Sequence, residues 1–148
     1  MKKNLLLTGL VVLACTLAFQ VRAGDVSQKV LKSFRETFPK AEQVSWQEYS
    51  DNYVVNFVAV GLHETITYDK EGNFISSTRY LTEENLPTNI LFRLKKKYPA
   101  LKVFGVTEIT TEANVEYYLK MEDDQHWVTI KADDGGMLLV VEKFEKIK

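Results

Sequence analysis

The amino-acid sequence predicts an α+β fold of two tandem units, each a helix followed by a four-stranded antiparallel β-meander. The units are expected to form one extended sheet with both helices on one face. Three observations support this fold. A helical pattern at residues 30–41 recurs at residues 90–101, and four strand-like runs separated by turn residues follow each copy. The link between the copies, residues 82–85, is short, so the copies are expected to share a core.

Residues 1–23 have the pattern of a secretory signal peptide and are expected to be removed. Lys2 and Lys3 form a basic start, and an uncharged apolar stretch follows at residues 5–19. This stretch is shorter than the roughly 20 residues that a membrane span needs. The pattern therefore predicts signal cleavage after Ala23, a mature chain without a transmembrane segment, and a periplasmic or secreted location.

Cys15 is the single cysteine, and it leaves a second way of processing open. Residues 12–15 read VLAC, which loosely resembles a lipobox in which the cysteine would carry a lipid anchor. Leu13 is bulky for its position, and an apolar run follows the cysteine where lipoproteins usually continue with polar residues. We therefore favour plain cleavage, after which the mature chain, residues 24–148, contains no thiol and no disulfide.

The two helices are predicted from apolar residues at helical spacing. Val30, Leu31, Phe34, Phe38 and Pro39 align with Ile90, Leu91, Leu94, Tyr98 and Pro99. Each helix is expected to bury one apolar stripe and to end before its proline, because proline disfavours helical geometry in the preceding residue. Ser27 is the expected N-cap of the first helix, and Thr82 or Asn85 that of the second.

Eight strand-like runs with short turns between them are expected to pair in antiparallel order. Asn, Asp and Gly occupy the turns and tolerate the left-handed backbone that tight hairpins need. The units then span about residues 26–81 and about residues 83–146 of one domain. The runs lie at about 43–49, 52–60, 62–69 and 73–81, and at about 102–111, 114–122, 125–132 and 136–145.

A set of short motifs in fixed order runs through nearly all of residues 26–145. They are Phe34-x3-Phe38-Pro39-x4-Val44-x-Trp46, Tyr53 to Phe57, Tyr68-Asp69-x2-Gly72, Leu86-Pro87, Tyr98-Pro99 and Asp134-Gly135. Together they resemble the bacterial PepSY-like proteins, a group described as β-lactamase-inhibitor-like. The resemblance implies a helix-on-sheet fold, a secreted or periplasmic protein and no catalytic residues. Unlike the lactamase inhibitor that gives the group its name, this chain has no disulfides, so we do not predict lactamase inhibition.

Composition and motifs argue against a nucleic-acid binder and against an enzyme. Removal of residues 1–23 takes three cations from a net charge of −1, and the resulting −4 lacks the basic footprint that phosphate binding needs. Neither a nucleophile motif nor a phosphate-binding glycine loop is present. His63 and His126 lack the spacing of metal ligands. We therefore predict no enzymatic activity, no cofactor and no metal.

Aromatic side chains supply the candidate binding surface. Tyr117 and Tyr118 are consecutive in one predicted strand and must point to opposite faces of the sheet. Trp127 has the opposite parity to Val128 and is also expected to face away from the helices. We predict that Tyr118 and Trp127, together with Tyr49, lie on an open sheet face that contacts another protein. Burial of this face by a second layer or by dimerisation is the alternative.

The leading interpretation is an exported, non-catalytic binding module that contacts an unidentified extracytoplasmic protein through the open sheet face. An inhibitor-like role is left open. One alternative is a small-ligand or peptide-binding envelope protein, which predicts a deep apolar cavity between sheet and helices. Another is a structural oligomer, which predicts a self-complementary patch.

Overall fold

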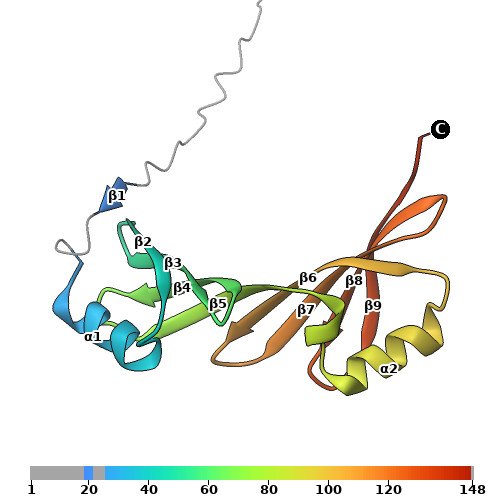
Figure 1. Cartoon of the computed structure of the whole chain (residues 1–148). Helices are drawn as coiled ribbons and strands as arrows, with labels where there is room; N and C mark the ends of the chain where they lie inside the picture. The colour runs from blue at the N-terminus through green and yellow to red at the C-terminus, as the bar shows by residue number, and fades with distance from the viewer. Residues whose placement is uncertain (1–18, 22–25, 148) are drawn as a thin grey trace, which may run out of the picture.

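The computed structural model describes residues 19–21 and 26–147 of the chain. Within these residues the fold has two α-helices, one 3-10 helix and nine strands, and all nine strands form a single antiparallel sheet in chain order. Figure 1 shows the long twisted sheet with α1 and α2 at its two ends. Cys15 and the predicted cleavage site after Ala23 lie outside the described residues.

The described chain begins with one three-residue strand. Each of the two α-helices that come after it is followed by four strands. The first elements are β1 Phe19–Val21, α1 Gln28–Thr37, β2 Glu42–Glu48, β3 Asn52–Ala59, β4 Leu62–Asp69 and β5 Phe74–Leu81. They are followed by the 3-10 helix η1 Glu83–Asn85, α2 Thr88–Lys97, β6 Lys102–Thr111, β7 Val115–Glu122, β8 His126–Asp133 and β9 Leu138–Glu145. β1 lies within the predicted signal peptide, so cleavage after Ala23 would leave β2 as the edge strand.

α1 forms where the sequence predicts it, because one apolar stripe meets the sheet and the first turn is capped. Val30 and Phe34 are buried on this stripe. The Ser27 hydroxyl accepts a hydrogen bond from the Val30 amide at 3.4 Å, which confirms the predicted N-cap. The helix ends before Phe38, whose amide donates to the Phe34 carbonyl at 2.8 Å.

α2 begins differently from the sequence-based expectation that Thr82 or Asn85 would cap it. Both residues instead belong to η1, where the Thr82 amide donates to Asn85 Oδ1 at 3.0 Å. Pro87 stands at the N-cap of α2, which has no side-chain cap. The prediction was wrong because a residue before proline disfavours helical geometry, so extended Leu86 separates η1 from α2.

Two separate hydrophobic clusters lie on the same face of the sheet, one under each helix, so the expectation that the two units share one core was wrong. Ile66 belongs to the cluster under α1 and pairs with Ser77, whereas Leu81 and its partner Val106 belong to the cluster under α2. Ser77 and Leu81 are four residues apart in β5 and therefore point to the same side. Both helices thus cover one face of the sheet, and no described helix covers the other.

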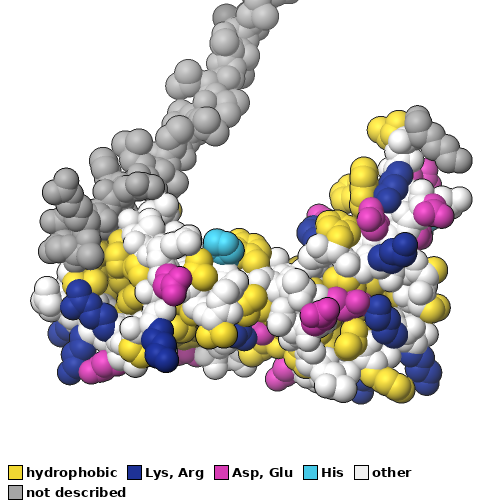
Figure 2. Space-filling view, viewed as in Figure 1, with side chains coloured by type: hydrophobic (Ala, Val, Ile, Leu, Met, Phe, Trp, Pro, Cys, Tyr) yellow, Lys and Arg dark blue, Asp and Glu magenta, His cyan; other side chains and the backbone are white. Residues whose placement is uncertain are grey.

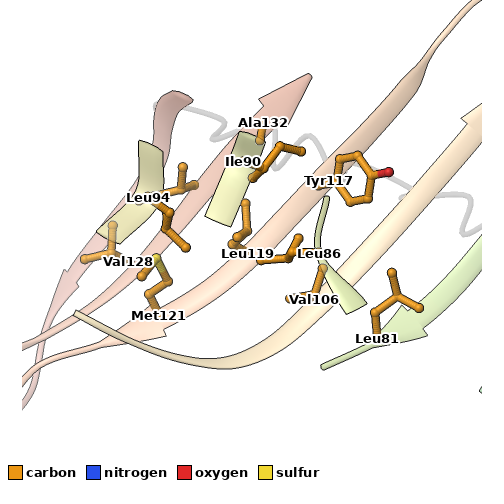
Figure 3. Close-up of a cluster of buried hydrophobic side chains, with 11 residues drawn as sticks. Leu81, Leu86, Ile90, Leu94, Val106, Tyr117, Leu119, Met121, Val128 and Ala132 are labelled. Carbon is orange, nitrogen blue, oxygen red and sulfur yellow. The ribbon is translucent and has the colours of Figure 1, made fainter. Parts of the chain in front are cut away.

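The cluster under α2 shows how a helix is fixed to the sheet. Ile90 and Leu94 of α2 are completely buried and point toward β7 and β8 (Figure 3). Leu119 and Met121 of β7 and Val128 of β8 lie beneath them. Each side chain of this size stabilises the fold by about 1.5–3 kcal/mol through removal of apolar surface from water.

A charged group lies between the two clusters on the helix-covered side of the sheet. Glu64 on β4, Arg79 on β5 and Glu108 on β6 are neighbours across three strands. Arg79 Nε donates to Glu108 Oε1 at 2.8 Å, and Glu108 is only 5% exposed. Burial raises the pKa of Glu64. Between the two apolar clusters, the Arg79–Glu108 ion pair thus links β5 of the first unit to β6 of the second.

Candidate protein-binding face

The face of the sheet opposite the helices, the open face, carries a continuous cross-strand row of side chains over β5 to β9. Figure 1 shows the β7–β8 hairpin and the end of β9 rising away from α2. In Figure 2 hydrophobic, acidic and basic side chains are interspersed over this rising part. The row consists of Tyr80, Thr107, Tyr118, Lys131 and Leu139.

Trp127 is the most exposed of the three predicted surface residues. Its side chain is 47% exposed and lies opposite Phe144 of β9, which is 58% exposed. Lys146 Nζ lies 5.5 Å from the centroid of the Trp127 ring and 2.8 Å from Glu122 Oε2. The hydrogen bond from Lys146 lowers the pKa of Glu122 and keeps it charged. An exposed aromatic pair is therefore held beside an ion pair.

Tyr118 is half-buried and fixed by its neighbours on the open face. Its hydroxyl donates to Glu116 Oε2 at 3.2 Å, and the ammonium of Lys131 lies 5.7 Å from its ring centroid. Lys131 Nζ is also 2.7 Å from Glu116 Oε1. This hydrogen bond lowers the pKa of Glu116 and raises that of Lys131, so both groups are charged at neutral pH.

A polar network separates Tyr118 from Trp127. Lys120 Nζ donates to Thr129 Oγ1 at 2.9 Å, and Thr129 Oγ1 donates to Glu142 Oε2 at 3.0 Å. The hydrogen bond from Thr129 is the main reason that the pKa of Glu142 is lowered. Tyr118 is level with Lys131, which is four residue steps from Trp127 along β8, a separation of about 14 Å. The structure thus places two aromatic positions on one face with an ordered polar bridge between them.

Tyr49 lies on the same side of the sheet but far from the other two predicted residues. It follows β2 directly, and its hydroxyl donates to Gln47 Oε1 at 3.2 Å. Six strand spacings separate β2 from β8, which is about 30 Å. The structure therefore does not bring Tyr49 together with Tyr118 and Trp127.

Sequence reasoning missed several exposed apolar side chains around the open face. Tyr80 could have been found by alternation, because the next residue, Leu81, is buried. Leu139 and Phe144 could not, because they are five residues apart and a bulge at Val141 is needed to bring them to one face. The missed residues are Tyr80, Phe104, Leu139 and Phe144, each between 57% and 60% exposed.

The two histidines are not arranged as metal ligands. His63 is exposed, and the His126 ring nitrogen Nδ1 lies 3.1 Å from Asp123 Oδ1 in the β7–β8 turn. Among the described residues no group of three or more His, Cys, Asp or Glu side chains could hold a metal ion. Neither described α-helix is long and apolar enough to cross a membrane.

The space between α1 and the sheet is filled rather than hollow. Beside the helix a groove of about 530 Å³ opens to solvent, with Phe34, Phe38 and Trp46 among its lining residues. The same aromatic rings form the packed cluster, with the Phe34 and Trp46 centroids 5.4 Å apart. This shallow groove differs from the deep apolar cavity expected of a small-ligand carrier.

Several solved structures from Bacteroides species have the same fold. A BLIP-like protein from Bacteroides fragilis is 22% identical and matches 80% of this chain and 85% of its own, with a TM-score of 0.64. A DUF2874 family protein from Bacteroides ovatus is 18% identical, with 80% and 86% covered and a TM-score of 0.63. A protein from Bacteroides eggerthii, provisionally described as periplasmic, is 15% identical, with 81% and 88% covered and a TM-score of 0.63.

These similarities establish a BLIP-like fold, a mostly antiparallel sheet with two helices. No family model matches the chain, and no curated protein matches it. At the identities found, the structural likeness concerns the fold alone, so a function has to be argued from the open face itself.

Proposed function

We propose that this chain is an exported, non-catalytic binding module that contacts another protein through the open face around Trp127 and Tyr118. The observation that carries the proposal is the exposed Trp127–Phe144 pair on a face that no described helix covers. Trp and Tyr dominate binding energy in protein interfaces, because they bury much apolar surface with few rotatable bonds. Tyr49 would contribute only to a partner that spans most of the sheet.

The surroundings of the aromatic side chains favour a protein partner. A protein interface combines a few apolar anchors with a polar rim of satisfied groups. The charges near Trp127 and Tyr118 are already paired with one another and held in place, so a partner would order few side chains on binding. The ion pairs are Glu116–Lys131, Lys120–Glu142 and Glu122–Lys146.

Fold analogy points in the same direction. A BLIP-like neighbour and the PepSY-like resemblance both support binding rather than catalysis. The signal pattern of residues 1–23 and a neighbour described as periplasmic support export, with cleavage after Ala23. Lipidation at Cys15 is the alternative processing. The partner is then an extracytoplasmic protein.

The proposal includes an origin by duplication of one helix-plus-four-strand unit. Matching details in the two halves support it. The C-caps Phe38 and Tyr98 have φ and ψ of −124° and 63° and of −132° and 59°. Gly72 and Gly136 both have positive φ, 89° and 82°, and each packs against the helix of its own unit. Such agreement between turns and caps is expected of two copies of one unit.

Affinity capture from the protein's own cell envelope tests the binding proposal. The bait proteins are native, Trp127→Ala, Tyr118→Ala and, as a matched control, Phe92→Ala. Phe92 is 71% exposed but lies on α2, away from the open face. We expect Trp127→Ala to reduce recovery of the partner at least about tenfold, equal to about 1.4 kcal/mol, and the control to leave it unchanged. Equal recovery by the native, Trp127→Ala and Tyr118→Ala proteins would exclude this surface.

A further inference from the structure

β9 is a long, exposed edge strand. It spans eight residues, and every residue from Leu139 to Glu145 is exposed. Val140 and Val141 are 42% and 41% exposed, although neither is charged or polar. An edge strand presents unpaired backbone amides and carbonyls, and natural proteins usually shorten, cover or charge such edges. β9 has charged residues only in its second half, and no described element covers it.

A bulge gives β9 an apolar pattern that regular alternation would not. Thr129 pairs with Glu142 and the next residue of β8 pairs with Val140, so Val141 is an extra residue in β9. Leu139 therefore lies opposite Lys131 on the open face, and Phe144 lies opposite Trp127 on the same face. The two exposed apolar side chains stand at opposite ends of the strand and on the same side of the sheet.

We propose that two copies of this chain pair through β9 in antiparallel order around a two-fold axis normal to the sheet. Such an axis keeps both open faces on one side, so only residues of the same face can lie opposite each other. Among the registers that meet this condition, we choose the one that places Leu139 of each copy opposite Phe144 of the other, because it brings the two exposed apolar side chains of the open face together. Val140 then lies opposite Lys143, and both are on the helix side of the sheet.

The charges at this edge agree with the proposed register. Glu145 of one copy lies opposite Leu138 of the second copy, and Lys97 Nζ is 3.4 Å from the Leu138 carbonyl oxygen. The Glu145 carboxylate of one copy and the Lys97 ammonium of the other are thus both close to Leu138, and the two-fold axis repeats this arrangement. Glu142, which lies near the axis, is already paired with Lys120 at 3.3 Å, so repulsion between the two Glu142 carboxylates is reduced.

A second copy is favoured over a foreign strand because this edge is complementary to itself. The aromatic row formed by Trp127 and Phe144 continues directly into Leu139 of the second copy, and the two-fold axis repeats that contact. Pairing of β9 with β2 of another copy would be head-to-tail and would not close. β2 is also a poor template, because Gln43 has a positive φ of 53° and the β2–β3 register shifts there.

The first experiment measures the mass of the exported protein by sedimentation equilibrium over concentrations up to the millimolar range. We expect a reversible monomer–dimer equilibrium whose dissociation constant rises at least about tenfold in Leu139→Lys. Val44→Lys is the control, because it places the same lysine at an exposed apolar residue, 41% exposed, that lies on β2 rather than on β9. A monomer at all concentrations, or equal effects of the two variants, would overturn the proposal. Unchanged melting temperatures show that both variants fold.

The second experiment tests the register by disulfide cross-linking in a Cys15→Ser background. Residues directly opposite each other in antiparallel strands have Cα atoms about 4.5–5.5 Å apart, which suits a disulfide. We expect Leu139→Cys mixed with Phe144→Cys to give a covalent dimer under mild oxidation. Each variant alone should remain uncross-linked, because neither position lies opposite itself. Cross-linking of either single variant as efficient as that of the mixture would show that the proposed register is wrong.

Discussion

Phe34→Ala is expected to destabilise the whole domain, although Phe34 lies at one end of it. The Phe34 side chain is 4% exposed. Its ring centroid lies 5.7 Å from Phe38, 5.4 Å from Trp46 and 5.0 Å from Phe57. Replacement by alanine removes these aromatic contacts and leaves a cavity between α1 and the sheet.

The expected loss is about 3–5 kcal/mol, the usual cost of truncating a buried Phe to Ala. A domain of this size has a total stability of about 5–15 kcal/mol, so the loss is a large part of it. With a urea dependence of about 2 kcal/mol per M, a loss of about 4 kcal/mol lowers the unfolding midpoint by about 2 M. Phe92→Ala, at an exposed position, should change stability by no more than about 0.5 kcal/mol.

The assay follows urea unfolding with two tryptophan probes, Trp46 in the first half and Trp127 in the second. β5 and β6 join the halves through six consecutive residue pairs, and Arg79 bonds Glu108 across this junction. Both probes should therefore report one transition, shifted equally by Phe34→Ala. A shift of the Trp46 transition alone, with Trp127 unchanged, would refute the view that the halves form one cooperative unit.

Three further predictions concern local features of the fold. Because burial raises the pKa of Glu64 above its ordinary value of 4.5, the native state binds that proton more tightly than the unfolded state, and this group adds stability as pH falls from 7 towards 4. Glu64→Gln should remove that contribution, so the difference in melting temperature between native protein and variant should change between pH 7 and pH 4. The same difference at every pH would contradict this prediction. Gly72→Ala should lower the free energy of unfolding more than Gly61→Ala. Both glycines have a positive φ, which costs an alanine about 1–2 kcal/mol, but only at Gly72 would the added Cβ also meet backbone, 3.1 Å from the Lys29 carbonyl carbon. Equal urea midpoints would disprove the close approach. Ser27→Ala should cost about 1 kcal/mol through loss of the α1 N-cap, whereas a midpoint within error of native would show that the cap adds nothing.

Helix and hairpin positions could be predicted because local chemistry determines them. The apolar stripe of α1, its cap at Ser27 and its end before Phe38 all depend on residues within one or two turns. β6 covers residues 102–111, as the alternation and flanking turns predicted. The start of α2 was wrongly predicted, although the signal is local. Pro87 keeps Leu86 extended, so Thr82 and Asn85 belong to η1 and α2 begins only after the proline.

The faces of the strands could be predicted only where alternation is regular. Tyr117 is buried whereas Tyr118 and Trp127 are on the open face, which their parity indicates. Alternation failed at the Val141 bulge, because a bulge depends on strand pairing and has no clear signal in the residues themselves. The parity of a residue in its strand predicts its face but not its distance from residues of other strands. The sequence therefore could not show that Tyr49 lies far from Tyr118 and Trp127. Whether any of these residues binds a partner stays a prediction.

The central claim, an uncovered sheet face that carries Trp127, can be tested by acrylamide quenching of tryptophan fluorescence. Trp46→Phe leaves only Trp127, and Trp127→Phe leaves only Trp46. Since Trp127 is 47% exposed and Trp46 4%, the first variant should be quenched strongly and the second weakly. Equal protection of the two indoles in the folded protein would contradict the account, because it would mean that the face proposed for binding is covered.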